Sequence, residues 1–174
     1  MIVLVLGGAR SGKSVVAESL AAGVSADGTV TVLATAVVAD DDMFARVAAH
    51  RRRRPAHWTT VETGPALAGA LRSVGGTVLV DALGTWLAQL PDLAADADDL
   101  CSALLDRPGD TVVVSEEVGL GVHPPSEAGR RFRDGLGSLN QAVAGIADEV
   151  LLVVAGRAMR LAPAEPLVRE VTQG

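Results

Sequence analysis

A glycine-rich segment directly after the first apolar run constrains the fold of this chain more than any other feature. The segment Gly7-Gly8-Ala9-Arg10-Ser11-Gly12-Lys13-Ser14 follows Ile2–Leu6 and matches the pattern G-x-x-x-x-G-K-[ST]. In this pattern the glycines let the backbone aim its N–H groups at a polyphosphate, while the lysine contacts phosphates and the hydroxyl contacts Mg²⁺. The motif requires a strand before it and a helix after it, so the sequence predicts a phosphate-binding loop at the carboxyl end of a strand.

Lys13 is the only lysine among the 15 Lys and Arg residues of the chain. An ammonium is a compact point charge and a guanidinium is a planar fork, so a single retained lysine is consistent with a position that needs the ammonium. We predict that Lys13 contacts the β- and γ-phosphates and that Ser14 is a ligand of Mg²⁺. The alternative is a glycine-rich strand-to-helix turn that matches the motif by chance.

Nearly continuous apolar runs alternate with segments of helical periodicity along the chain. The runs are typical of strands buried on both faces, and they are Ile2–Leu6, Thr29–Thr35, Thr77–Val80, Thr111–Val114 and Val150–Val154. The helical segments are Val15–Ala22, Met43–Arg53, Ala66–Val74 and the stripe Phe132, Leu136, Leu139, Val143 and Ile146. This order predicts an α/β fold, a mostly parallel sheet flanked by helices.

The length of 174 residues suits one domain with one open sheet. We expect that domain to span residues 1–161 and a C-terminal tail to span residues 162–174. Within the domain, Pro91 to Asp110 is rich in Asp, Ala and Pro, and we expect a surface excursion around a short helix.

Carboxylates follow two of the predicted strands. Asp81 closes Thr77–Val80, and Glu116 and Glu117 follow Thr111–Val114. Because ligands of open α/β sheets bind at the carboxyl ends of the strands, we predict that Asp81 is the carboxylate that holds Mg²⁺ and that Glu117 also faces the site. The alternative for each is a helix N-cap or a loop carboxylate in solvent, and the role of Glu116 stays open.

A basic segment after the second strand adds a candidate nucleophile. Arg46, His50 and Arg54 recur at a spacing of four, which places them on one helix face. An imidazole between guanidinium groups is disfavoured in its protonated form, so His50 is suited to act as a neutral nucleophile or base while the arginines attract a triphosphate. The alternative is an exposed arginine-rich helix with an incidental histidine. We expect His57 to be a turn or packing residue and His123 to lie in a loop that borders the site.

Composition excludes several classes of function. The net charge of −6 and the scarcity of aromatic residues, two Trp, two Phe and no Tyr, argue against nucleic-acid binding through Arg51–Arg54. No apolar run approaches the roughly 18–20 residues that span a bilayer, and the first run is too short for a secretory signal. We therefore expect a cytoplasmic protein without a membrane span. Cys101 lies in an apolar helical stretch and has no second cysteine to pair with, so we expect a small core residue.

Several blocks in order resemble the adenosylcobinamide kinase/adenosylcobinamide-phosphate guanylyltransferase family of cobalamin biosynthesis, and the resemblance runs from Met1 to about Leu161. The blocks are Gly7-Gly8-Ala9-Arg10-Ser11-Gly12-Lys13-Ser14; Ala34-Thr35-Ala36; Arg46-x-x-x-His50-Arg51-x-x-Arg54-Pro55-x-x-Trp58; Val80-Asp81-x-Leu83-x-x-Trp86-Leu87; Glu117-Val118-Gly119-x-Gly121; Phe132-Arg133-Asp134-x-x-Gly137-x-x-Asn140-Gln141; and Ala147-Asp148-Glu149-Val150. The first block is shared with many NTPases, but its combination with the histidine–arginine block is specific to this family.

The resemblance implies a phosphate-loop NTPase fold of the RecA type and two reactions on one scaffold. A nucleoside triphosphate phosphorylates the hydroxyl of adenosylcobinamide, and GTP then guanylylates a histidine that passes GMP to the phosphorylated product. By position, the resemblance implies that His50 is the guanylylated nucleophile, with Lys13 and Asp81 as the other catalytic residues. The residues that it implies for nucleotide binding are Gly7, Gly8, Ala9, Arg10, Ser11, Gly12, Lys13, Ser14, Thr35, Arg46, Arg51, Arg54, Glu62 and Glu117, with Ser14 and Asp81 as ligands of Mg²⁺.

The resemblance also implies a homotrimer, with ATP and GTP as substrates. One departure from the family pattern concerns the site, because Glu116 stands where many members have Asn. A negative charge that points toward a polyphosphate at this position would be unfavourable. Two alternatives stay open: a phosphate-loop kinase for another small alcohol, in which His50 is dispensable, and a nucleotide-binding regulatory switch.

Overall fold

The computed structural model describes residues 1–36 and 52–165, and Arg46, His50 and Arg51 lie outside these ranges. The elements are β1 Ile2–Gly7, α1 Lys13–Val24, β2 Thr31–Ala34, β3 Thr59–Glu62, α3 Leu67–Ser73, β4 Val78–Asp81, α4 Leu83–Leu87, the 3-10 turn η1 Pro91–Leu93, α5 Ala97–Asp106, β5 Thr111–Glu116, α6 Glu127–Ile146, β6 Glu149–Val154 and β7 Arg157–Arg160. The strands form one sheet in the order β3-β2-β4-β5-β1-β6-β7. Every neighbouring pair is parallel except β6 and β7, which form an antiparallel hairpin at one edge.

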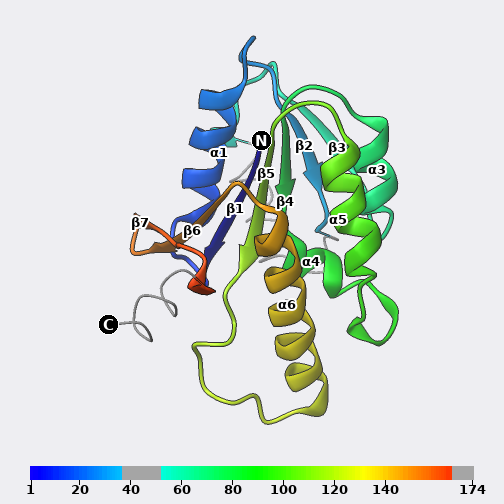
Figure 1. Cartoon of the computed structure of the whole chain (residues 1–174), viewed down its shortest axis with the longest axis vertical. Helices are drawn as coiled ribbons and strands as arrows, with labels where there is room; N and C mark the ends of the chain where they lie inside the picture. Colours follow the sequence, from blue (N-terminus) through cyan, green and yellow to red (C-terminus); the bar gives the residue numbers. More distant parts are fainter. Residues whose placement is uncertain (37–51, 166–174) are drawn as a thin grey trace.

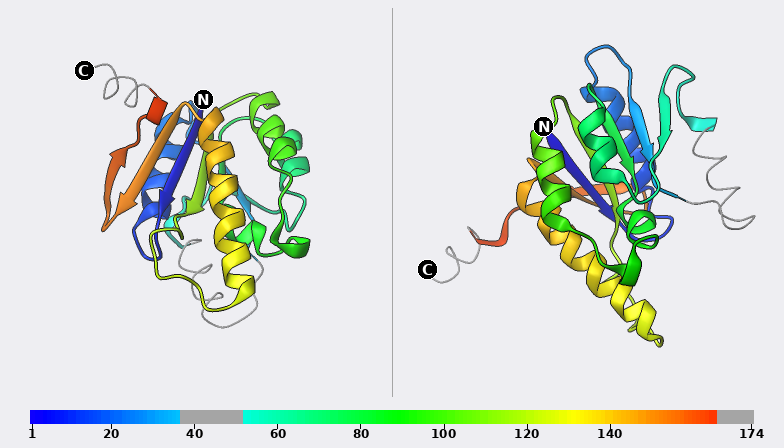
Figure 2. Two further views of the ribbon diagram at one scale, coloured as in Figure 1. Left: turned by 60° about the horizontal axis from the view of Figure 1, so that its bottom comes forward. Right: turned by 90° about the vertical axis from the view of Figure 1, so that its right-hand side faces the viewer.

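Helices cover both faces of the sheet, α1 on one face and α3, α5 and α6 on the other (Figures 1 and 2). Successive residues of β1 point to opposite faces, so Val3 and Val5 pack with Ala17 and Ala21 of α1 while Leu4 and Leu6 join the core under the other helices. Both sets are buried, because a parallel sheet with crossover helices has no face in water. The continuous apolar runs of the sequence follow from this two-sided burial.

The predicted fold class is confirmed as a mostly parallel sheet with flanking helices. All five predicted strands form, with ends shifted by up to a few residues. The helices predicted at Val15–Ala22, at Ala66–Val74 and from the Phe132–Ile146 stripe form as α1, α3 and α6. The helix predicted at Met43–Arg53 lies almost wholly outside the described residues.

Other parts of the fold differ from the prediction. Thr59–Glu62 and Arg157–Arg160 are edge strands, and their mostly exposed side chains gave no apolar run to detect. The segment from Pro91 to Asp110 is only partly the surface excursion that we expected. Its helix α5 is amphipathic and buries Leu100, Ala103 and Leu104 against the core.

None of the helices within residues 1–36 and 52–165 combines the length and the apolarity that crossing a membrane requires.

Candidate functional site

The glycine-rich segment forms the predicted loop between β1 and α1, at the carboxyl edge of the sheet (Figure 1). Gly12 precedes α1 with φ of 94°, a backbone conformation that side chains with a Cβ rarely adopt. Gly7 has no room for a Cβ, which would lie 2.5 Å from Ser11 Oγ and 2.7 Å from the Val153 carbonyl oxygen. The loop therefore needs glycine at both positions to keep its path.

The turn between β6 and β7 supports this loop from the side. The Gly156 N–H donates a hydrogen bond of 2.7 Å to the Ser11 carbonyl oxygen. The Cα of Gly156 lies 3.2 Å from the place that a Cβ on Gly12 would take. The hairpin at the sheet edge therefore helps to fix the phosphate-binding loop, a role that sequence reasoning missed.

Lys13 points its ammonium group back over the loop. Nζ donates to the Gly8 carbonyl oxygen at 3.4 Å and lies 3.6 Å from Glu116 Oε1. The Lys13 side chain is only 11% exposed and that of Glu116 is 27% exposed, so water has limited access to the pair. This ion pair lies where the motif predicts the phosphates.

Glu116 is brought to Lys13 by the register of the sheet. Gly7 at the end of β1 pairs with Glu116 at the end of β5, so the loop begins level with this carboxylate. Its second oxygen, Oε2, accepts a hydrogen bond of 3.1 Å from the Gly84 N–H. A Cβ on Gly84 would lie 2.1 Å from Oε2, so the inward position of Glu116 depends on glycine at residue 84.

Glu117, which the sequence analysis favoured as a carboxylate of the site, contacts the loop after β5 instead of Lys13. Its Oε1 accepts a hydrogen bond of 2.7 Å from the Gly119 N–H within the loop after β5. The structure thus places Glu116, and not Glu117, beside Lys13. Side chains alternate along a strand, so a shift of one residue at its end decides which of two neighbouring carboxylates faces the loop.

Asp81 ends β4 and forms an ion pair with Arg54. Arg54 NH2 lies 2.5 Å from Asp81 Oδ2, and Arg54 Nε lies 3.2 Å from Glu18 Oε1 on α1. The Arg54 side chain is 7% exposed, and those of Glu18 and Asp81 are 11% and 17% exposed. Arg54 therefore links the segment before β3 to the carboxyl edge of the sheet through two largely buried carboxylates.

Thr35, directly after β2, forms hydrogen bonds with the segment that follows Asp81. Its hydroxyl donates to the Ala82 carbonyl oxygen at 2.7 Å, accepts from the Ala82 N–H at 3.0 Å and lies 2.6 Å from Thr85 Oγ1. The Gln89 side-chain amide also donates to the Thr35 carbonyl oxygen. Thr35 is 1% exposed, so its contacts in this structure are internal ones that join β2 to α4.

Other predicted residues lie around this edge. Ser14 is half-buried in the first turn of α1, Ala9 and Arg10 are exposed in the loop, and Glu62 is exposed at the end of β3. His57 lies in a turn, as one of the two predicted roles, turn or packing, requires, and its Nε2 lies 3.0 Å from the Gly28 carbonyl oxygen.

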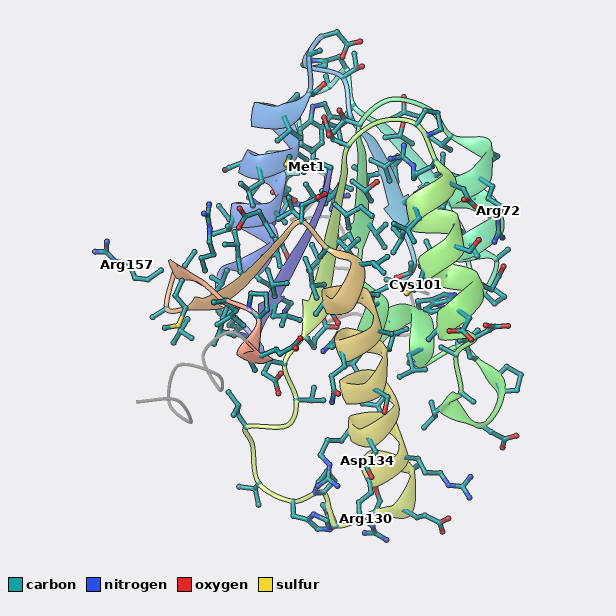
Figure 3. All side chains as sticks on the ribbon, viewed as in Figure 1. Met1, Arg72, Cys101, Arg130, Asp134 and Arg157 are labelled. Atoms are coloured by element: carbon teal, nitrogen blue, oxygen red, sulfur yellow. The ribbon has the colours of Figure 1, made fainter. Side chains whose placement is uncertain are left out.

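The loop between β5 and α6 borders the same edge and is tied to the start of α6. His123 lies in this loop with Nδ1 2.8 Å from Arg133 NH1. Arg130, which lies in the first turn of α6 and is labelled in Figure 3, donates to the carbonyl oxygens of Pro124 and Pro125.

Ser14 and Asp81 offer the kind of oxygen donors that suit Mg²⁺. This ion prefers hard oxygen ligands and usually binds through one or two protein groups together with waters and substrate phosphates. In the described part of the chain, no three His, Cys, Asp or Glu side chains gather as a metal cage made only of protein would need. The donor set therefore fits an ion that arrives with a nucleotide.

Asn140 is a further residue of the site that sequence reasoning did not assign. Its Nδ2 donates to the Glu116 carbonyl oxygen at 3.0 Å, and its Oδ1 accepts from Ser115 Oγ at 2.6 Å. It is 7% exposed on the buried face of α6, beside Leu136, Leu139 and Val143. A polar side chain within an apolar helical stripe was the available signal, and its contacts fix the end of β5.

Comparison with known proteins shows the family to which this chain belongs. The family model described as cobinamide kinase / cobinamide phosphate guanyltransferase matches residues 3–161. The bifunctional adenosylcobalamin biosynthesis protein CobP of Pseudomonas aeruginosa is 45% identical in an alignment of length 173 that covers 94% of this chain and 98% of that protein. The bifunctional adenosylcobalamin biosynthesis protein CobU of Escherichia coli is 36% identical in an alignment of length 183 that covers 92% of this chain and 99% of that protein.

A solved structure is similar in fold. It is a prototypical ATPase from the type III secretion system of pathogenic bacteria, with a TM-score of 0.53 over 98% of this chain and 61% of that chain. The two sequences are 12% identical, so the similarity concerns the fold alone. It agrees with the phosphate-loop NTPase fold expected from the glycine-rich segment.

Proposed function

Because the chain belongs to the cobinamide kinase / cobinamide phosphate guanyltransferase family, we propose that it catalyses two consecutive reactions on a cobinamide substrate. In the first, a nucleoside triphosphate, ATP or GTP, phosphorylates the hydroxyl of adenosylcobinamide. In the second, GMP passes from GTP to the phosphorylated product, which gives adenosyl-GDP-cobinamide and pyrophosphate. The observation that supports the proposal is the position of Lys13 after a glycine-rich loop at the carboxyl end of β1, within the residues that match the family.

The kinase step draws on the loop and on the ends of β1 and β4. The substrate hydroxyl oxygen bonds to the γ-phosphorus, the bond from that phosphorus to the bridging oxygen breaks, the nucleoside diphosphate leaves, and the hydroxyl proton is lost to solvent. Lys13 and the loop N–H groups balance charge on the phosphates, and Ser14 and Asp81 would hold Mg²⁺, which neutralises further phosphate charge when bound. Arg54 is suited to move from Asp81 to a phosphate, since both partners are anionic oxygens.

The guanylyl transfer assigns the nucleophile to His50. An imidazole nitrogen bonds to the α-phosphorus of GTP and pyrophosphate leaves, and the proton of the imidazole is lost to solvent. The phosphate oxygen of the cobinamide product then attacks the same phosphorus and frees the histidine. A covalent intermediate of this kind divides one difficult transfer into two easier ones. The proposal extends to Arg46, Arg51 and Arg54 as phosphate contacts and to Thr35, Glu62 and Glu117 as nucleotide contacts.

The family resemblance also supports a homotrimer, and the absence of any apolar run long enough to span a bilayer supports a cytoplasmic location. Both belong to the proposal.

The experiment that tests the proposal follows both products in one reaction. The full chain is incubated with adenosylcobinamide, GTP and Mg²⁺, and the corrinoids are separated by liquid chromatography with mass detection. We expect both adenosylcobinamide phosphate and adenosyl-GDP-cobinamide. Lys13→Ala should lower phosphorylation by at least about 10²-fold, because the charge that it supplies acts on the transferred group.

A matched pair of histidine variants separates the two steps. His50→Ala should phosphorylate the substrate but form no GDP-cobinamide, whereas His57→Ala should retain both steps because His57 lies in a turn with its Nε2 beside the Gly28 carbonyl oxygen. Formation of GDP-cobinamide by His50→Ala would contradict the assignment of the nucleophile. Formation of the phosphate but not of GDP-cobinamide by the native chain would leave a kinase without nucleotidyl transfer.

A further inference from the structure

We propose that Glu116 is a positioning residue for Lys13 that holds the ammonium beside the loop and competes for it with the phosphates of an incoming nucleotide. This inference rests on the proposed nucleotide chemistry and deepens it. It predicts that the native carboxylate weakens nucleotide binding, so that removal of its charge strengthens binding. The effect acts through Lys13 and needs no contact between Glu116 and the transferred group.

The Lys13 ammonium already has an anionic partner, Glu116, where the motif places phosphates. The Glu116 carboxylate, 3.6 Å from Nζ, is the ion-pair partner of Lys13 in the described residues. In the motif, the same ammonium contacts the β- and γ-phosphates. A carboxylate and a phosphate that share one ammonium repel each other, and the repulsion is strong where water is partly excluded. A triphosphate must therefore take the ammonium from Glu116 or bind beside an uncompensated charge.

The surroundings of Glu116 hold its carboxylate beside the loop. Three separate features keep its carboxylate at the loop: the register with Gly7, the hydrogen bond from the Gly84 N–H, and the lack of a Cβ at Gly84. Asn140 fixes the backbone of the same residue through the Glu116 carbonyl oxygen. The carboxylate is thus held at the site by its surroundings.

The test measures binding without any transfer reaction. Native chain and Glu116→Gln are titrated by calorimetry with GDP and with the β,γ-imido analogue of ATP, both in the presence of Mg²⁺. Glutamine keeps the shape of the side chain and can still accept from the Gly84 N–H, but it lacks the charge. We expect Glu116→Gln to bind both nucleotides about tenfold more tightly. Glu127→Gln removes one negative charge from an exposed site on α6 and should leave both affinities unchanged.

A second variant displaces the same carboxylate by adding a side chain at residue 84. Gly84→Ala should push Oε2 away from the loop and tighten binding in the same direction, and it should add little in a Glu116→Gln background. A kinase assay then separates this role from catalysis, because we expect a lower KM for the nucleotide and no higher kcat in Glu116→Gln.

Two results would overturn the inference. Equal or weaker nucleotide binding by Glu116→Gln would show that the carboxylate does not compete for Lys13. A large loss of kcat at unchanged affinity would assign Glu116 to the chemical step instead. A failure of guanylyl transfer alone would contradict the proposed function at His50 and would leave these binding results unaffected.

Discussion

At the scale of single residues, the site is organised by basic side chains that meet more than one partner. Arg54 lies between Glu18 and Asp81, and Lys13 lies between the Gly8 carbonyl oxygen and Glu116. Such groups neutralise carboxylates that would be unfavourable alone in a largely buried place. The same groups are the ones that the proposed function requires for phosphate, so nucleotide binding must exchange one set of anions for another.

Arg54 should therefore matter to stability as well as to activity. Arg54→Ala leaves Glu18 and Asp81 largely buried without this partner, and we expect it to lower the free energy of unfolding by about 3 kcal/mol. Arg53 is the matched control, because it also contacts Glu18 but its side chain is 38% exposed. Arg53→Ala should cost less than about 1 kcal/mol. Urea denaturation of both variants provides the comparison, and equal losses would contradict this account.

At the scale of elements, the phosphate-binding loop depends on the β6–β7 hairpin, which carries none of the residues of the loop motif. The turn between β6 and β7 donates to the Ser11 carbonyl oxygen and packs against Gly12. The loop, α1 and the hairpin are therefore expected to lose order together. Changes at the glycines that have no room for a side chain should affect all three.

Gly12→Ala and Gly8→Ala form a matched pair for this expectation. At Gly12 the φ of 94° and the nearby Gly156 oppose a side chain, and we expect a loss of about 1–3 kcal/mol in the free energy of unfolding. A Cβ on Gly8 meets nothing within 4 Å, so Gly8→Ala should change stability by no more than about 0.5 kcal/mol. Thermal unfolding followed by circular dichroism gives both values. A Gly12→Ala protein as stable as Gly8→Ala would show that the loop tolerates another path.

Elements that are buried on both faces were predictable from the sequence, and the exposed ones were not. Apolar runs mark β1, β2, β4, β5 and β6 because their side chains enter the core on both sides. The edge strands β3 and β7 present mostly exposed side chains, and the five-residue α4 is too short for a helical period to show. Sequence reasoning proposed Lys13, Asp81 and Glu117 for the site, whereas the structure places Glu116 beside Lys13, because the choice between the two glutamates depends on one residue of strand register.

At the scale of the whole molecule, one sheet edge collects side chains from positions far apart in the sequence. Lys13 follows β1, Asp81 ends β4 and Glu116 ends β5, and parallel strands bring these ends to the same edge. Contacts such as those of Arg54 and Asn140 depend on packing between layers, so the sequence does not show which partners these side chains meet. Loss of core packing should therefore also disrupt the site.

Cys101 offers a probe of that core packing. It packs against the core from α5, where Figure 3 labels it, and burial together with the nearby Asp98 raises the pKa of its thiol. A raised pKa leaves less thiolate at a given pH, so we expect alkylation by iodoacetamide at pH 8 to be at least about tenfold slower in the native chain than in urea. Equal rates in the two states would show that the α5 side of the core opens readily.

The central claim is that His50 carries GMP between GTP and the cobinamide substrate, and intact-protein mass spectrometry tests it most directly. Native chain, His50→Ala and His57→Ala are incubated with GTP and Mg²⁺ without any corrinoid. We predict that the native chain and His57→Ala gain the mass of one GMP, in a linkage labile to acid and stable to alkali, and that His50→Ala gains none. A GMP adduct on His50→Ala, or no adduct on a native chain that binds and turns over nucleotide, would contradict the claim.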